Sequence, residues 1–313
     1  MVPVLNGAAV GLGEAFVLGG NVFGWTATED ESVAVLDAYV EGGGRTIDTA
    51  DAYSAWVPGH RGGESEEIIG RWLAARGHRD SLMIATKVGQ HPGAPGLSRA
   101  SIRAGIEGSL RRLRTDRVDL YFAHFDDPDT PLEETVAALD ELVREGKVRH
   151  LAASNYAPDR LVRAFDVAAD GGLAGFVAFQ AHYNLVRRSA FETRYRDLLA
   201  ARGLAVLTYY SLAQGFLTGK YRDGGSDGTG PRVAPAVRYL DDRGRRVLAV
   251  LDRLAAGHGV PPAAVALAWL SAQPVVTAPT VSARTPAQLA EISACRGLRL
   301  DPAELAALDE ASS

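Results

Sequence analysis

The sequence predicts one (β/α)8 TIM barrel, an α/β fold in which eight parallel strands alternate with helices. Short β-rich segments that end in polar residues alternate with amphipathic segments at intervals of roughly 30 to 40 residues, and they form eight units. No break in composition divides the 313 residues, which favours one domain over residues 1–313. The dinucleotide-binding fingerprint of a doubly wound sheet is missing, because Phe16 takes its third glycine position.

The predicted strands are short runs rich in β-branched and aromatic residues. In chain order they are Phe16–Gly19, Thr46–Asp48, Leu82–Lys87, Val118–His124, Val148–Ala153, Phe176–Gln180, Ala205–Tyr209 and Val275–Pro279. Because a helix carries the chain back after each strand, neighbouring strands are expected to run parallel.

The predicted helices between the strands have apolar residues at a period of 3.6. In chain order they are Glu31–Glu41, Ser65–Arg76, Ser98–Leu113, Pro131–Glu145, Pro158–Ala168, Phe191–Ala201 and Pro261–Ala272. For the helix that begins at Pro131, Thr130 is expected to be the N-cap and Glu133 to complete a capping box.

Other segments are expected to decorate the eight units. The first fifteen residues are expected to form a small β-hairpin, and Tyr239–Gly257 an additional helix. The Gly- and Pro-rich stretch Asp223–Pro235 is expected to be a mobile loop. Asp301 and Glu304 have the spacing of a capping box that opens a last helix.

Composition limits the function classes. A net charge of −5 provides no basic surface for nucleic acid. The single cysteine, Cys295, excludes a disulfide within the chain and a cysteine-rich metal site, and no metal is expected. The sequence has no signal-peptide pattern and no run of ~18 apolar residues, so a cytoplasmic protein without membrane partners is expected. The oligomeric state stays open.

Polar residues of four kinds follow three neighbouring strands. Asp48 ends the second strand and Tyr53 lies just beyond it, Lys87 ends the third, and His124 ends the fourth. Active sites of such barrels lie at the carboxyl ends of the strands. These side chains are therefore expected to meet at one rim, although each alone also has a structural explanation, such as a turn cap or a core histidine.

This combination suits the reduction of a carbonyl group. Hydride addition leaves negative charge on oxygen and needs a proton donor, and a tyrosine with pKa ~10 is too weak an acid unless its phenolate is stabilised. Lys87 can provide that stabilisation, Asp48 can keep Lys87 charged and oriented, and His124 can hydrogen-bond the substrate oxygen.

The remaining strand ends suggest a cofactor site. Ser154, Asn155 and Gln180 follow the fifth and sixth strands with groups suited to a carboxamide, and Tyr209 can stack on a flat ring. Arg284 precedes a short helix whose N-terminus can hold a phosphate. The alternative for Gln288 is a capping box with Thr285 that serves only the helix.

From about Gly19 to Glu291 the chain resembles the aldo-keto reductases. The likeness rests on several blocks in the right order, which are Asp48–Tyr53, Thr86–Lys87, Asp119–His124, Gly146–Arg149, Ser154–Tyr156, Gln180–Asn184, Leu212–Tyr221 and Val265–Leu270. The resemblance implies a catalytic tetrad of Asp48, Tyr53, Lys87 and His124, with Tyr53 as proton donor. It also implies an NADPH cofactor that lies extended across the barrel mouth.

The resemblance further implies contacts for each part of NADPH. Ser154, Asn155 and Gln180 would hold the nicotinamide amide, and Tyr209 would stack on its ring. Leu212, Gln214 and Lys220 would line the pyrophosphate, Arg284 would meet the 2′-phosphate, and Gln288 and Glu291 would lie near the adenosine. Gly20 and Asn21 would touch the cofactor or the substrate. The other expected cofactor residues are Tyr210, Ser211 and Ser282.

The chain departs from the family pattern at a few positions. Ser54 stands where a glycine often follows the tyrosine, and Tyr210 and Ser211 replace a common Ser and Pro. Ser282 replaces a common Gly and Ile292 an adenine-contacting Asn, so a weaker preference for NADPH is expected. None of these positions belongs to the tetrad.

The sequence leaves the substrate open and allows two other functions. Trp25, Trp56, Phe125 and the segment Asp223–Pro235 are the expected walls for a carbonyl substrate. One alternative is a cofactor-sensing subunit that resembles potassium channel beta subunits, against which the intact tetrad argues. The other is an aldolase with Lys87 as Schiff base, which a lysine kept protonated by Asp48 disfavours.

Overall fold

The computed structural model describes residues 10–222 and 230–313. Eight parallel strands hydrogen-bond in sequence order and close into a barrel, because β8 pairs with both β7 and β1. Their bounds are β1 Val17–Gly19, β2 Thr46–Asp48, β3 Met83–Val88, β4 Val118–Ala123, β5 Val148–Ser154, β6 Phe176–His182, β7 Ala205–Tyr209 and β8 Ala278–Val281. The predicted barrel is confirmed.

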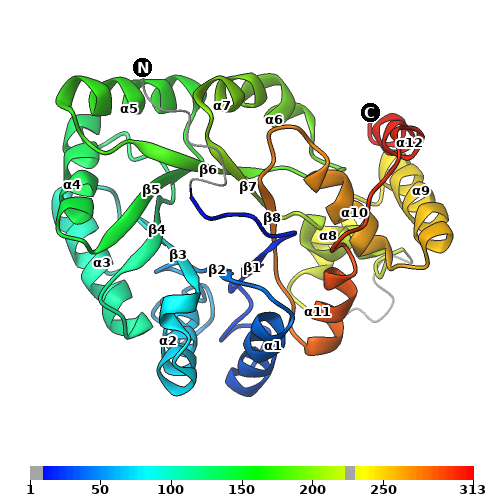
Figure 1. Cartoon of the computed structure of the whole chain (residues 1–313), viewed down its shortest axis with the longest axis horizontal. Coiled ribbons are helices and arrows are strands. Elements are labelled where there is room, and N and C mark those ends of the chain that lie inside the picture. The colour runs from blue at the N-terminus through cyan, green and yellow to red at the C-terminus, as the bar shows by residue number, and fades with distance from the viewer. Residues whose placement is uncertain (1–9, 223–229) are drawn as a thin grey trace.

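Helices surround this barrel (Figure 1). Their bounds are α1 Glu29–Glu41, α2 Glu64–Arg76, α3 Arg99–Leu113, α4 Leu132–Arg144, α5 Pro158–Gly171, α6 Ser189–Arg194, α7 Arg196–Arg202, α8 Val233–Val237, α9 Asp242–His258, α10 Pro262–Ser271, α11 Pro286–Ser293 and α12 Pro302–Ala311, with short 3-10 helices η1 Arg79–Ser81 and η2 Ala213–Thr218. Most of the core lies between these helices and the strands.

Several alanines, aliphatic side chains and the ring of Phe122 fill the barrel interior, so the centre is packed and is not a channel. At the amino ends of the strands, Val10 and Leu12 join this inner cluster and close the barrel. Figure 1 shows their segment in dark blue, crossing the barrel opening before β1. The opposite end is left for the site.

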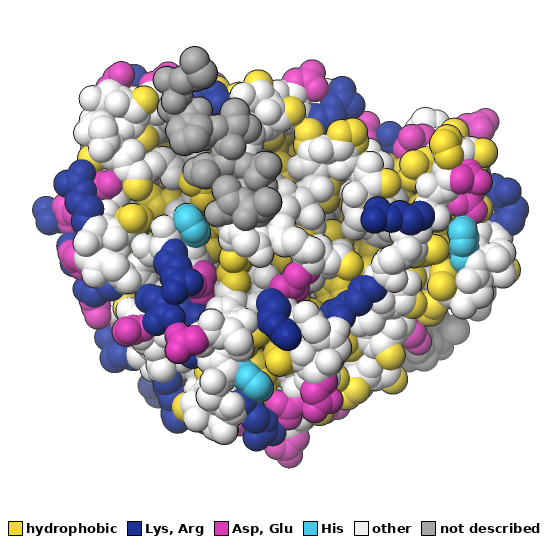
Figure 2. Space-filling model, in the orientation of Figure 1, with side chains coloured by type: hydrophobic (Ala, Val, Ile, Leu, Met, Phe, Trp, Pro, Cys, Tyr) yellow, Lys and Arg dark blue, Asp and Glu magenta, His cyan; other side chains and the backbone are white. Residues whose placement is uncertain are grey.

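Acidic and basic side chains are interspersed over the face drawn in Figure 2, and neither sign dominates it. This agrees with the mixed charge expected from composition. Asp119, on the barrel wall, is 2% exposed; it accepts from the backbone N–H of Ile84 and forms an ion pair with Arg79.

Two predicted helices differ from the structure for tertiary reasons. The predicted helix Phe191–Ala201 is split into α6 and α7 at Tyr195, whose hydroxyl donates to the carbonyl of Tyr156 and whose ring stacks on Phe179. Thr130 does not cap α4, because its hydroxyl donates to Asp127 at 2.7 Å and Pro131 takes the N-cap position instead. The predicted capping box with Glu133 is absent there.

Three other predictions need correction or fall partly outside the described ranges. β8 begins at Ala278 and not at Val275, because a turn includes Val276, whose N–H donates to the carbonyl of Gln273. The predicted hairpin falls mostly on residues that are not described, and residues 10–15 contain no strand. Of the predicted loop Asp223–Pro235, residues 223–229 lie outside the description, and the end from Val233 belongs to α8.

Candidate active site

A cavity of about 1200 Å³ opens at the carboxyl ends of the strands. Active sites of (β/α)8 barrels lie at this end. Nearly all residues predicted for the site line this cavity: Asn21, Trp25, Asp48, Tyr53, Trp56, His124, Phe125, Ser154, Asn155, Gln180, Tyr209, Tyr210, Ser211, Leu212, Gln214, Lys220, Ser282, Arg284, Gln288 and Glu291.

Two predicted residues lie outside the cavity wall. Lys87 is fully buried next to the floor. Gly20 has its N–H on the carbonyl of Asp48 at 2.7 Å, and its own carbonyl accepts from the hydroxyl of Ser65. Gly20 therefore holds the backbone beside Asp48, and the structure does not bring it to the cavity.

Lys87 connects the predicted catalytic residues. Its Nζ donates to Asp48 Oδ2 at 2.7 Å, to the hydroxyl of Tyr53 at 3.0 Å and to the carbonyl of Thr49 at 2.7 Å. Each proton of the ammonium thus has one acceptor. The ends of two neighbouring strands, β2 and β3, thus deliver one continuous hydrogen-bonded group.

The charges of this group depend on one another. Burial alone would lower the pKa of Lys87, but Asp48 and Tyr53 outweigh burial and raise it, so the ammonium stays charged. This state argues against a Schiff-base nucleophile. Burial raises the pKa of Tyr53, and Lys87 opposes that rise. The ammonium thus acts on the phenol in the expected direction, although burial prevails.

His124 lies at the end of β4 with its ring centroid 6.2 Å from that of Tyr53. Burial, with a smaller contribution from Lys87, lowers the pKa of His124 to about 3. The imidazole is therefore neutral near pH 7 and carries one N–H donor. Its Nδ1 is buried with no hydrogen-bond partner among the described residues, and the residue lines the cavity.

The loop after β2 explains a departure from the family pattern. Ser54 has φ 73°, in the left-handed region that favours glycine. Its buried hydroxyl donates to the carbonyl of Phe23 at 3.1 Å, which ties this strained turn to the loop after β1. The serine therefore preserves the turn that directs Tyr53 toward Lys87.

The predicted carboxamide residues form a network of their own. Asn155 donates to the carbonyl of His124 and to the hydroxyl of Ser154, both at 3.0 Å, and accepts from the hydroxyl of Tyr209 at 2.8 Å. Gln180 is 3% exposed, and its Nε2 donates to Asp48 Oδ1 at 3.3 Å. These residues lie next to the Lys87 group within one cavity.

The segment after β7 has an unusual backbone. Tyr210, Ala213 and Gln214 are non-glycine residues in the left-handed region, and Gly215 follows with φ 94°. Such conformations cost of order 1–3 kcal/mol each and cluster at functional sites. Ser211 is buried, and its hydroxyl donates to the carbonyl of Thr280 at 2.8 Å, which fastens this segment to β8.

At the end of β8 an exposed arginine meets a helix N-terminus. Arg284 precedes α11, whose N-cap Thr285 accepts from the N–H of Gln288. The Oε1 of Gln288 accepts from the N–H of Arg284 at 3.0 Å, one residue before the predicted capping-box partner. The predicted capping box is therefore incomplete: Thr285 caps the helix, while the side chain of Gln288 binds the backbone of Arg284 and lines the cavity.

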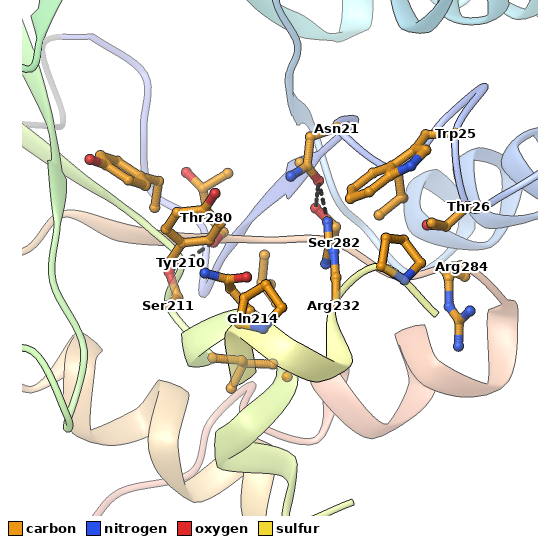
Figure 3. A pocket seen from close by; sticks show the side chains of 18 of the residues that line it. Asn21, Trp25, Thr26, Tyr210, Ser211, Gln214, Arg232, Thr280, Ser282 and Arg284 are labelled. Atoms are coloured by element: carbon orange, nitrogen blue, oxygen red, sulfur yellow. Dashed lines mark hydrogen bonds between the residues drawn. The ribbon is translucent and has the colours of Figure 1, made fainter. Parts of the chain in front are cut away.

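Arg232 is a cavity residue that the sequence analysis did not single out. Its guanidinium lies 5.3 Å from the ring of Trp25 and donates to Asn21 Oδ1 at 3.3 Å, an oxygen that also accepts from the hydroxyl of Ser282. Figure 3 shows the side chain of Asn21 pointing toward Ser282 and Arg232, with Trp25 beside Asn21. Burial lowers the pKa of Arg232. The only sequence signal was an arginine within a segment expected to form a wall.

Aromatic rings surround the mouth of the cavity near Tyr53. The most exposed large apolar side chains among the described residues are Trp56 at 51%, Phe125 at 43% and Tyr210 at 42%, and all three line this cavity. Trp56 also contacts Trp25 edge to face, with centroids 5.3 Å apart. Exposed rings gathered at one opening are typical of a binding surface.

The described residues contain no group of three or more His, Cys, Asp or Glu side chains that could hold a metal ion. No single described helix is long and apolar enough to span a membrane, although α9 and α10 pass that test together across a 98° bend.

Comparison with known proteins agrees with this geometry. The family model described as "Aldo/keto reductase family" matches residues 15–313. The chain is 35% identical to the uncharacterized oxidoreductase YrpG of Bacillus subtilis (strain 168), over 94% of this chain and 90% of that protein. It is 32% identical to a probable voltage-gated potassium channel subunit beta of Oryza sativa subsp. japonica, over 86% and 83%. It is also 32% identical to L-glyceraldehyde 3-phosphate reductase of Escherichia coli (strain K12), over 79% and 75%. The chain therefore belongs to the aldo/keto reductase family of oxidoreductases.

Proposed function

We propose that this protein reduces an aldehyde or ketone to an alcohol with NADPH, and that Tyr53 is the general acid. The observation that carries the proposal is the position of Lys87, whose Nζ contacts both Asp48 and the hydroxyl of Tyr53 beside a cavity large enough for a dinucleotide and a substrate. The cofactor supplies the hydride.

The residues of the chain supply the proton and the orientation. Tyr53 donates its phenolic proton to the carbonyl oxygen as negative charge develops there, and Lys87 stabilises the phenolate that remains. Asp48 keeps Lys87 charged and oriented. The neutral imidazole of His124 donates a hydrogen bond to the same oxygen and orients the substrate.

The polar residues along the cavity suit an extended phosphorylated cofactor. Ser154, Asn155 and Gln180 would offer amides and a hydroxyl to the nicotinamide carboxamide, and Tyr209, which lines the same cavity, would stack on the ring. The strained segment from Tyr210 to Gly215 and the guanidinium of Arg232 suit the pyrophosphate. The remaining proposed cofactor residues at this end are Asn21, Leu212, Lys220, Ser282, Gln288 and Glu291.

Arg284 is proposed to select NADPH. A guanidinium at a helix N-terminus can hold a 2′-phosphate through charge-assisted hydrogen bonds. Arg284→Ala should therefore remove most of the difference in affinity between NADPH and NADH, about 1.5–3 kcal/mol. Titrating both cofactors by quenching of tryptophan fluorescence measures this difference.

Arg299→Ala is the matched control, because Arg299 is exposed and does not line the cavity. That variant should keep the preference of the wild type. Ile292 and Ser282 depart from the family pattern, so the wild-type preference is expected to be weaker than is usual in the family. Equal affinities of the wild type for NADPH and NADH would refute the assignment to Arg284.

A panel of carbonyl compounds, followed by the loss of NADPH absorbance, tests the function itself. The proposal is supported if the wild type reduces any compound of the panel and Tyr53→Phe does not. A second candidate function is that of a cofactor-sensing subunit, because the relative in Oryza sativa is named as a probable potassium channel subunit beta. That reading predicts tight NADPH binding without turnover of any carbonyl on the panel.

The rings at the mouth are proposed as substrate walls. Trp25, Trp56 and Phe125 can pack on a substrate whose carbonyl reaches Tyr53, and burying one large side chain is worth ~1.5–3 kcal/mol. Trp56→Ala should therefore raise KM for an aryl aldehyde roughly tenfold or more and change KM for a two- or three-carbon aldehyde little. Equal changes for both substrates would contradict this wall.

A further inference from the structure

Gln180 makes the contact that spans the mouth of the barrel. β6, which carries Gln180, and β2, which carries Asp48, stand opposite each other in the ring of eight strands. The side chain of Gln180 reaches across this distance, and its Nε2 donates to Asp48 Oδ1 at 3.3 Å. Its backbone carbonyl is fixed separately, by the hydroxyl of Ser154 at 3.0 Å.

The side chain of Asp48 depends on the donor that Gln180 provides, because it is only 2% exposed to solvent. A carboxylate removed from water is costly unless its oxygens are hydrogen-bonded. Among the described residues, Lys87 donates to Oδ2 and Gln180 donates to Oδ1. Burial raises the pKa of Asp48, while Lys87 and Gln180 both lower it. The two oxygens of Asp48 are thus held from opposite sides of the barrel.

We propose that Gln180 is a positioning residue for the reaction: it orients the ionised carboxylate of Asp48, and through Asp48 it holds Lys87 against Tyr53. The proposal rests on the proposed function. It adds a second role to the side chain assigned there to the nicotinamide carboxamide. The Oε1 of Gln180 is left to accept from that amide while its Nε2 holds Asp48, so one side chain links the cofactor to the proton donor.

A pH profile separates this role from cofactor binding. Gln180→Leu removes a hydrogen bond that favours ionised Asp48, so Asp48 should take up its proton at a higher pH. The acid limb of the kcat profile should move up by about one unit, and kcat at neutral pH should fall roughly tenfold. The other titratable groups here are Lys87, which binds this carboxylate, and Tyr53, which accepts from Lys87, and neither is changed.

Ser154→Ala is the matched control, since Ser154 belongs to the same proposed carboxamide set and has no bond to Asp48. Its hydroxyl donates only to the backbone carbonyl of Gln180, and the pairing of β6 with β5 and β7 holds that backbone in either case. It should weaken NADPH binding and leave the acid limb where it is. Gln180→Glu provides a second variant of nearly the same shape. Its carboxylate would lie beside Asp48, so it should move the acid limb further in the same direction.

Thermal unfolding of the protein without cofactor is an independent readout. Gln180→Leu should lower Tm in the wild type and lower it clearly less in an Asp48→Asn background, because the charge that Gln180 serves is gone. Additive losses of Tm, or an acid limb that Gln180→Leu leaves unmoved, would overturn the positioning role. Retained turnover in Tyr53→Phe would instead refute the proposed function, so the two failures are distinct.

Discussion

Replacing Tyr53 with phenylalanine should remove nearly all carbonyl reduction while leaving NADPH binding intact. The change deletes only the hydroxyl that lies 3.0 Å from Lys87 Nζ, and this hydroxyl is the proposed proton donor. General acid catalysis is worth ~10²–10⁴-fold, so kcat should fall by that factor. Lys87 keeps its bonds to Asp48 and to the carbonyl of Thr49, so the fold should not change.

Tyr121→Phe is a suitable control for this variant. Tyr121 is a fully buried tyrosine outside the cavity, and its hydroxyl has no hydrogen-bond partner among the described residues. Its loss should leave turnover close to that of the wild type. Absorbance of NADPH measures turnover, and tryptophan fluorescence measures binding. If Tyr53→Phe kept more than about a tenth of the rate on a good substrate, Tyr53 would not be the general acid.

Replacing Lys87 with methionine should damage catalysis as much as the loss of Tyr53 and should also destabilise the fold. Methionine removes the charge that stabilises the phenolate and leaves Asp48 buried without its ionic partner. Breaking a buried pair in this way costs about 3–5 kcal/mol. Denaturant unfolding measures the free energy of unfolding, and single-turnover kinetics measure the chemical step.

The double variant Lys87→Met with Asp48→Asn tests whether the two residues act as a unit. Asp48→Asn alone should reduce kcat somewhat less than Lys87→Met, because orientation and charge balance are lost while the ammonium remains. In the double variant the unpaired carboxylate is gone, so stability should recover much of its loss and the kinetic effects should not add. Additive losses in both measurements would count against a coupled group.

The sequence by itself determined the order of the barrel and the composition of the site. Alternating strand and helix patterns reflect local periodicity, and the side chain that follows each strand must face the same end of a parallel barrel. The sequence alone therefore assigns Asp48, Tyr53, Lys87 and His124 to one rim. The blocks Asp48–Tyr53 and Asp119–His124 then identified the family.

Tertiary structure decided the features that depend on contacts between distant segments. Val275 and Val276 have the β propensity of a strand, yet the strand begins only at Ala278, where pairing with β7 starts. Tyr195 interrupts a helical pattern because its ring and hydroxyl are held by Phe179 and Tyr156. Local propensity is a weak preference that such contacts override.

Dependence on contacts between distant segments also explains which features of the site the sequence indicates and which it does not. Residue types and spacing indicated which side chains share a rim, because the backbone of a barrel sets their direction. They could not show that Gln180 bonds to Asp48 or that Arg232 lies over Trp25. Those contacts join strands and loops across the barrel mouth, and only the closed sheet brings their side chains within hydrogen-bonding distance.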